Sequence, residues 1–212
     1  MALVPYIPGR DFDAELCTEF PRIEQVTAFL VVWIRNHFSD PQNMIDPSLQ
    51  RKLWSATDTR GGVIIEDAGV WEPTKAGQRP AVLVSRQDYN IQRQIIDDRM
   101  QGVPELTGTR YYMNMAEGKH TVVAVSPLQK EADLYGMDVY RELNGFAPSI
   151  RANFGFTKFQ VINIGAPTKA IKEYGSHWAV PITLDIAFQQ TWRLVPQAPL
   201  LKTLAIEYIP PQ

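Results

Sequence analysis

The sequence has little of what several large classes of protein require. It contains one cysteine, Cys17, which excludes an intrachain disulfide framework and a cysteine-rich metal site. Its longest uninterrupted apolar run, residues 28–34, is far shorter than the roughly 20 residues that cross a bilayer, so we expect no membrane contact. A formal net charge of −2 and a pI of about 5.9 provide no basic excess that would drive binding to nucleic acid.

Motifs that carry chemistry are also scarce. The three histidines, His37, His120 and His177, lie in separate segments and have no partner at metal-ligand spacing. The segment GAPTKA at 165–170 lacks the second glycine that a phosphate-binding loop places before its lysine. We therefore predict no catalytic, cofactor-binding or metal-binding residues. An enzyme whose pocket is built from His120, His177 and carboxylates across a sheet stays open as an alternative.

What the sequence does contain is the pattern of a globular core. Hydrophobic residues make up 45% of the chain, an ordinary value for a folded domain. Pro21 is predicted to open a first helix, and apolar residues at helical spacing continue it over 22–38. This helix is apolar on nearly all sides and is therefore expected to be covered on nearly all sides, either inside the domain or by a neighbouring subunit. Ser126 as N-cap and Pro127 at the first helical position predict a second helix, which stops near Asn144. A short third helix over 148–154 is possible.

In several segments hydrophobic and polar residues alternate with a period of two, which predicts strands. The segments 107–118 and 119–127 are predicted to be two strands joined by a turn at Glu117-Gly118. Because strands occur in runs, we predict an α+β fold with a mainly antiparallel sheet and two principal helices on one face. The predicted strands are 61–71, 81–89, 107–118, 119–127, 159–167 and 177–192, with a possible last strand or arm at 203–209. The predicted organisation is an extended N-terminal arm over 1–20 and a single domain over 21–212, with loop excursions near 40–60, 72–80 and 90–106.

The segment HWAVPITLDIAFQQTW at 177–192 is unusually long for a strand. At 3.3 Å per residue it reaches roughly 50 Å, whereas a compact chain of this size has a radius of gyration of about 17 Å. We expect it to outrun its own domain and to complete its backbone hydrogen bonding on another copy of the chain, with Pro181 at a sheet edge or bulge. Large aromatic residues and arginines beside turns and strand ends are candidates for the subunit interface: Trp71, Arg79, Arg86, Trp178 and Trp192.

Two stretches carry a resemblance to a known family. The segment GVIIEDAGVWEPTKAGQRPAVLVSR at 62–86 and the strand VPITLDIAF at 180–188, with the order of the predicted elements, resemble tail terminator and neck proteins of tailed bacteriophages. The resemblance covers most of residues 20–195. The chain departs from the family in its longer N-terminal arm and in the excursion at 90–106.

The resemblance implies a structural virion protein with no enzymatic activity and no cofactor. Such proteins form homo-oligomeric rings, commonly hexamers, that cap the tail tube protein and dock to a head-side connector or stopper protein. DNA would pass through the lumen without sequence-specific binding, and the ring would assemble in the host cytoplasm and remain in the virion. Another neck, head-closure or baseplate ring protein is an alternative, as is a module that binds small molecules or nucleic acid.

Overall fold

A computed structural model of the chain describes residues 12–16, 22–57, 61–72, 79–93, 110–170 and 177–196. The chain divides into two compact units. The first, which we call the body, comprises residues 20–92 and 115–189, and the second comprises residues 1–19, 93–114 and 190–212. The side chains discussed below belong to the body.

Both long helices that the sequence predicts are present. The first helix was predicted to begin at Pro21 and to run through Phe38, and the observed helix begins two residues later and ends one residue later. The proposed stop near Asn144 and the short helix after it are also confirmed. The helical elements are α1 (Ile23–Ser39), α3 (Gln129–Gly145), α4 (Ala147–Phe154) and the short 3-10 turns η1 (Pro41–Asn43) and η2 (Leu49–Arg51).

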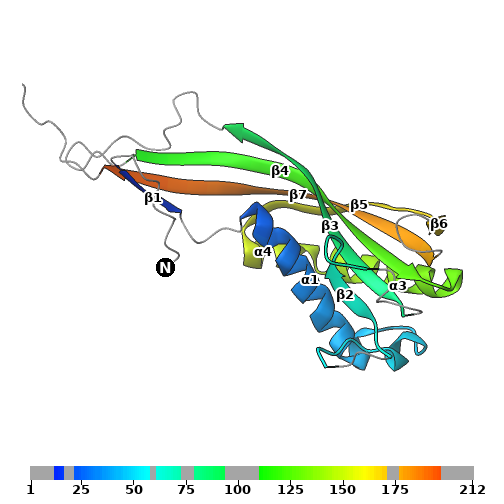
Figure 1. Cartoon of the computed structure of the whole chain (residues 1–212). Coiled ribbons are helices and arrows are strands. Elements are labelled where there is room, and N and C mark those ends of the chain that lie inside the picture. Colours follow the sequence, from blue (N-terminus) through cyan, green and yellow to red (C-terminus); the bar gives the residue numbers. More distant parts are fainter. Residues whose placement is uncertain are drawn as a thin grey trace, which may run out of the picture. The chain divides into compact units, whose positions relative to one another are not determined.

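The strands form one mixed sheet, so the predicted α+β fold is confirmed. Its order is β1-β7-β4-β3-β2, and β5 and β6 also pair with β7. The β2–β3 pair is parallel, whereas β7 pairs antiparallel with β1, β5 and β6. Within the body, β4 runs opposite to both β3 and β7 (Figure 1). The strands are β1 (Phe12–Leu16), β2 (Ile64–Asp67), β3 (Ala81–Arg93), β4 (Arg110–Ser126), β5 (Phe156–Ile164), β6 (Thr168–Ala170) and β7 (His177–Pro196).

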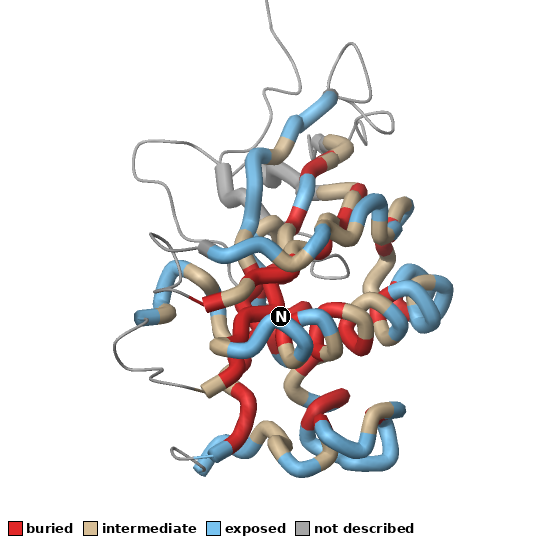
Figure 2. Tube along the Cα trace, turned by 90° about the vertical axis from the view of Figure 1, so that its right-hand side faces the viewer, coloured by how far each residue is buried: buried red, intermediate tan, exposed pale blue. Residues whose placement is uncertain are grey.

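The main core lies between the helices and one face of the sheet. Alternate residues of β7 from Val180 to Phe188, fully buried, point into this core together with Val82 and Val84 of β3. Figure 2 shows buried residues concentrated where helices and strands of the body meet. The chain itself does not cover α1 on all sides, since Val32 is 52% exposed, and whether a neighbouring subunit covers it stays a prediction.

The opposite face of the sheet carries only a small apolar cluster. Ala81 and Leu83 of β3 pack there with Val123 and Val125 of β4 and with Ala179. These residues alternate with those of the main core, as expected for one strand that serves two faces. Most of the apolar burial of the body is therefore on the side of the helices.

The predicted turn at Glu117-Gly118 is wrong. Residues 110–126 form a single strand of 17 residues, and Gly118 lies inside it. A Cβ atom at this position would lie 2.5 Å from ring atoms of Tyr89 on β3. Glycine is thus used here for a close approach between neighbouring strands and not for a turn.

The expectation that the long strand lacks backbone partners inside its own chain is also wrong. β7 runs over 20 residues, even longer than predicted, but it lies inside the sheet. One side pairs with β4, and the other pairs in turn with β6, β5 and β1. The chain itself therefore supplies strands along both sides of β7.

Pro181 lies inside this strand and not at a sheet edge. β5 pairing ends with Ile164 opposite Ile182, and β6 pairing begins with Thr168 opposite Ala179. The carbonyl oxygen of Pro181 accepts a hydrogen bond from Gly165 N at 2.7 Å, so Pro181 faces the interval between β5 and β6. Proline has no backbone N–H to donate to a neighbouring strand, and here it occupies the position where regular pairing is interrupted.

The remaining differences are local. Ser126 lies two residues before the N-cap of α3, where its Oγ accepts from Leu128 N at 3.2 Å. Leu128 is the N-cap residue of α3 and is 64% exposed, since α3 begins one residue later. Residues 12–16 of the predicted arm form a strand, β1. The possible strand at 203–209 and most of the excursion at 90–106 lie outside the described residues.

Candidate functional site

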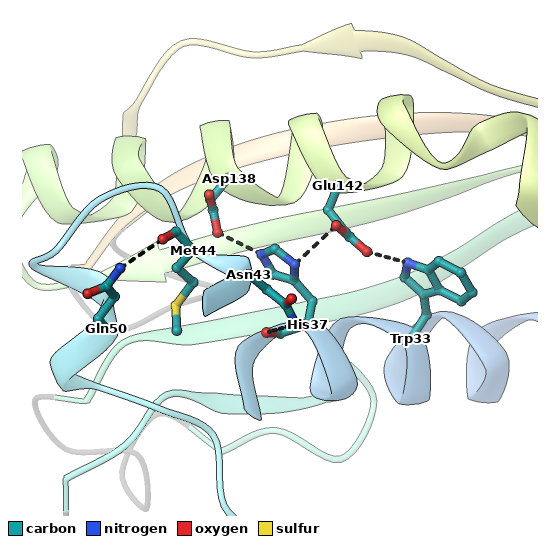
Figure 3. Close-up of polar contacts among 7 residues, drawn as sticks. All are labelled: Trp33, His37, Asn43, Met44, Gln50, Asp138 and Glu142. Atoms are coloured by element: carbon teal, nitrogen blue, oxygen red, sulfur yellow. Dashed lines mark hydrogen bonds and ion pairs between the residues drawn. The ribbon is translucent and has the colours of Figure 1, made fainter. Parts of the chain in front are cut away.

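The closest approach to a catalytic arrangement is a buried charge cluster between α1 and α3 (Figure 3). Nε2 of His37 lies 2.7 Å from Oδ2 of Asp138, and Nδ1 lies 3.1 Å from Oε2 of Glu142. The other oxygen of Glu142 accepts a hydrogen bond from the indole N–H of Trp33 at 3.0 Å. The side chains of His37 and Asp138 are each 4% exposed, so the cluster is closed to solvent.

The protonation state of His37 determines whether this cluster can act in catalysis. Burial opposes a charge on His37, but the hydrogen bonds to Asp138 and Glu142 outweigh it and raise the pKa of the imidazole to about 9. His37 is therefore a cation at neutral pH, with both ring nitrogens protonated and facing carboxylates. It has no free nitrogen to accept a proton, so it cannot act as a general base. The cluster joins two helices.

His120 is buried in the opposite protonation state. Its Nε2 lies 3.1 Å from the hydroxyl of Thr27, and its Nδ1 lies 3.2 Å from the hydroxyl of Tyr89. Burial, helped by the positive charge of Arg86, lowers the pKa of His120 to about 4. A neutral imidazole uses one nitrogen as donor and the other as acceptor, which suits two hydroxyl partners.

The hypothesis of a pocket shared by two histidines is not favoured by this geometry. His120 faces α1 on the helix side of the sheet, where it contacts Thr27. His177 has the same strand parity as Ala179, which packs on the opposite face. The two rings therefore belong to different faces of the sheet.

The predicted interface residues do not form one patch. Trp71 packs against the small cluster and Trp178 against the main core, on opposite faces of the sheet. Arg79 donates from Nε to the carbonyl of Gly62 at 3.0 Å and so holds the chain before β2. Arg86 is exposed on β3. Trp192 lies in β7 opposite Leu16 of β1, and its side chain is outside the described part of the structure.

An ion cluster that the sequence did not predict lies on the sheet face away from the helices. Nζ of Lys158 on β5 lies 2.7 Å from Oδ2 of Asp185 on β7 and 3.2 Å from Oε1 of Glu117 on β4. The hydrogen bonds to Asp185 and Glu117 raise the pKa of the Lys158 ammonium group. With two carboxylates and one ammonium group, this cluster carries a formal excess of one negative charge.

The third feature is an open sheet edge. β2 pairs only with the first residues of β3, Ala81–Val84, all of which are fully buried. Beyond Val84, no other described strand pairs with β3 on that side. Most side chains over Ser85–Gln92 are exposed, whereas Tyr89 packs against the core. Among the described strands, β3 therefore continues beyond Val84 as an edge strand whose outward backbone donors and acceptors have no strand partner.

The sequence contained a partial signal for two of these features. Asp138 and Glu142 are four residues apart on a predicted helix, beside the buried positions Tyr135 and Val139. An acidic pair next to an apolar stripe indicates a buried cation, but not that His37 supplies it. The strand predicted over 81–89 already includes most of the exposed part of β3, but its last residues, 90–93, were assigned to the excursion at 90–106.

No helix among the described residues is long and apolar enough to cross a membrane. The described part of the chain also contains no group of histidine, cysteine, aspartate and glutamate side chains that could hold a metal ion. A comparison with models of known protein families found no match, and a comparison with curated proteins found no significant similarity.

Proposed function

We propose that this chain is a structural protein that assembles with copies of itself into a ring in the neck of a tailed bacteriophage. The observation that carries the proposal is the length of the central strands. β3, β4 and β7 have 13, 17 and 20 residues, whereas strands of globular proteins usually have about five or six. An enzyme of this size has no evident use for such strands.

The exposure along β3 supports the same proposal. Its first four residues are fully buried, and Arg86–Asp88 and Asn90–Gln92 are exposed. An exposed edge of this length is a liability for a monomer, because it offers a template for pairing with other chains. A protein that assembles with its own copies can use such an edge.

The two stretches that resemble phage tail terminator and neck proteins have definite places in the body. Residues 62–86 contain β2 and the first part of β3, which form the parallel pair at one side of the sheet. Residues 180–188 are the part of β7 whose alternate residues fill the main core. The resemblance thus concerns the sheet, together with the helices that pack on it.

Within this class, the tail terminator is the assignment we favour. The ring, most simply a hexamer, would cap the tail tube protein and join it to a head-side connector or stopper protein, as part of the virion. DNA would pass through its lumen without sequence-specific contacts, in keeping with the absence of a basic excess in the sequence. Other neck, head-closure and baseplate rings are the neighbouring assignments.

Electron microscopy of the purified protein, alone and mixed with the tail tube protein of the same phage, tests the proposal. We expect closed rings from the protein alone and rings at one end of each tube in the mixture. Particles no larger than a single chain in both samples would contradict the proposal. Rings that never bind tubes would contradict only the assignment as tail terminator.

A further inference from the structure

The strand β2 is the outermost described strand on its side of the sheet and pairs only with β3. In such a strand, successive residues direct their backbone groups alternately toward the partner and away from it. The N–H of Ile64 donates to the carbonyl of Pro80, just before β3, at 2.9 Å, so Ile64 faces β3. Ile65 and Asp67 therefore face outward, where an edge strand offers its backbone to other chains.

The chain itself occupies both of these outward carbonyl groups. Arg35 of α1 donates to the carbonyl oxygen of Ile65 from Nε at 3.0 Å and from Nη2 at 2.8 Å. The carbonyl oxygen of Asp67 accepts from Val70 N at 3.0 Å, within the turn that follows the strand. A paired strand would lie about 4.8 Å from β2. The guanidinium group of Arg35 therefore occupies the space in which the backbone of an added strand would lie.

The position of the guanidinium group is fixed by its surroundings. Arg35 is half-buried, and its guanidinium carbon lies 5.2 Å from the ring centroid of Trp54. Trp54 is held by its own backbone, since its N–H donates to the carbonyl of Phe38 at the end of α1 at 2.9 Å. The planar guanidinium group thus has a ring to lie against and one carbonyl that receives two of its donors.

An outer strand on the other side of the body, β5, is protected in a different way. Its register with β7 shifts twice, once between Phe156 and Lys158 and once between Val161 and Asn163. Each shift leaves one extra residue in β5, which is the pattern of a β-bulge. Bulges disturb the regular spacing of donors and acceptors that an incoming strand would need. Protection of outer strands is therefore a recurrent feature of this sheet.

We infer that Arg35 blocks the addition of a strand to β2 and so confines self-association of the chain to other surfaces. A contact at an open β2 edge would join unlike surfaces, and such contacts give open-ended polymers unless the rotation between copies closes a ring. The inference goes beyond the proposed function and does not depend on it. It concerns an association that is prevented, whether the wild type forms rings or not.

Replacement of Arg35 tests this role. Arg35→Met removes the donors and keeps an unbranched apolar stem against Trp54. We expect species larger than those of the wild type to increase about tenfold at a fixed protein concentration, because the carbonyl of Ile65 becomes available. Sedimentation velocity measures these species, and amide hydrogen exchange should show added protection of Ile64–Asp67 in them. Arg141→Met, at an exposed arginine of α3, removes the same charge and should behave like the wild type.

A second control separates an open edge from a loss of stability. His37→Gln destabilises the same helix but leaves Arg35 in place, so it should add no protection at Ile64–Asp67. If Arg35→Met is folded and keeps the wild-type size distribution, the inference is wrong. It is equally wrong if Arg35→Met associates without added protection at Ile64–Asp67.

Arg35→Lys provides the same test with a milder change. It keeps the charge near Trp54 but replaces two converging N–H donors by one ammonium group. We expect an increase in larger species of about threefold, with the same added protection of Ile64–Asp67. If Arg35→Met does not fold, a wild-type size distribution of Arg35→Lys contradicts the inference.

Discussion

At the scale of single residues, two buried histidines are held in opposite protonation states by their neighbours. His37 faces two carboxylates and is charged, whereas His120 faces two hydroxyl groups and is neutral. Burial alone would lower the pKa of both, so the chemistry of the partners decides the difference. Each histidine consequently makes the stability of the fold depend on pH in its own range.

Loss of His37 should be costly because it leaves Asp138 buried without its cation. We expect His37→Gln to lower the free energy of unfolding by about 3–5 kcal/mol at pH 7. Asn36→Ala, an exposed substitution on the same helix, should change it by less than about 0.5 kcal/mol. Denaturant unfolding monitored by circular dichroism measures both. Equal stability of the two variants would show that the cluster contributes nothing.

The raised pKa of His37 also predicts a loss of stability in alkali. The folded protein holds this proton up to pH about 9, whereas the unfolded chain releases it near pH 6.5. The contribution of His37 is complete below pH 6.5 and is lost as the pH rises through 9, by about 3 kcal/mol in total. Unfolding of the wild type and of His37→Gln across this range should show a decline that the variant lacks.

His120 predicts the opposite dependence. Its folded-state pKa of about 4 lies below the ordinary value of 6.5, so in this range the unfolded chain binds a proton that the folded protein does not. Stability should therefore fall by about 3 kcal/mol as the pH drops from 6.5 to 4. Histidine resonances in an NMR titration report this directly. A His120 signal that titrates near pH 6.5 in the folded protein would rule out the lowered pKa.

At the scale of elements, the helices were easier to predict from the sequence than the strands. The apolar repeat over 22–38 is local information, and with Pro21 as the predicted start it placed both ends of α1 to within two residues. The length of β4 depends instead on the neighbouring strand, since Gly118 marks a close approach of Tyr89. A glycine beside a glutamate has the composition of a turn, so its real use could not be read from neighbouring residues. The partner of His37 could not be predicted from neighbouring residues either, because Asp138 lies 101 residues away in the sequence.

Two glycine substitutions test this interpretation of β4. Gly118→Ala puts a methyl group against the Tyr89 ring, and we expect it to lower stability by about 1–3 kcal/mol through overpacking. Gly145→Ala, at the end of α3, has no atom within 4 Å of the added carbon and should be neutral or slightly stabilising. Thermal unfolding of both variants measures the difference. A harmless Gly118→Ala would mean that the two strands do not approach so closely.

At the scale of the whole molecule, the reason for assembly differs from the one that the sequence suggested. The long strand β7 finds partners inside its own chain, so it does not by itself require a second copy. Among the described strands, the backbone groups without a strand partner are instead on β3 beyond Val84, in a segment predicted as a strand only as far as Tyr89. The great length of β7 was readable from alternation, but sheet order is set by contacts between distant segments and was not.

The central claim is that the chain completes its sheet by joining copies of itself into a closed ring. Sedimentation equilibrium over a wide range of protein concentrations tests it most directly. The account predicts one discrete species whose mass is a fixed multiple of the 24.0 kDa subunit, most simply sixfold. A mass of 24.0 kDa at every concentration would contradict it.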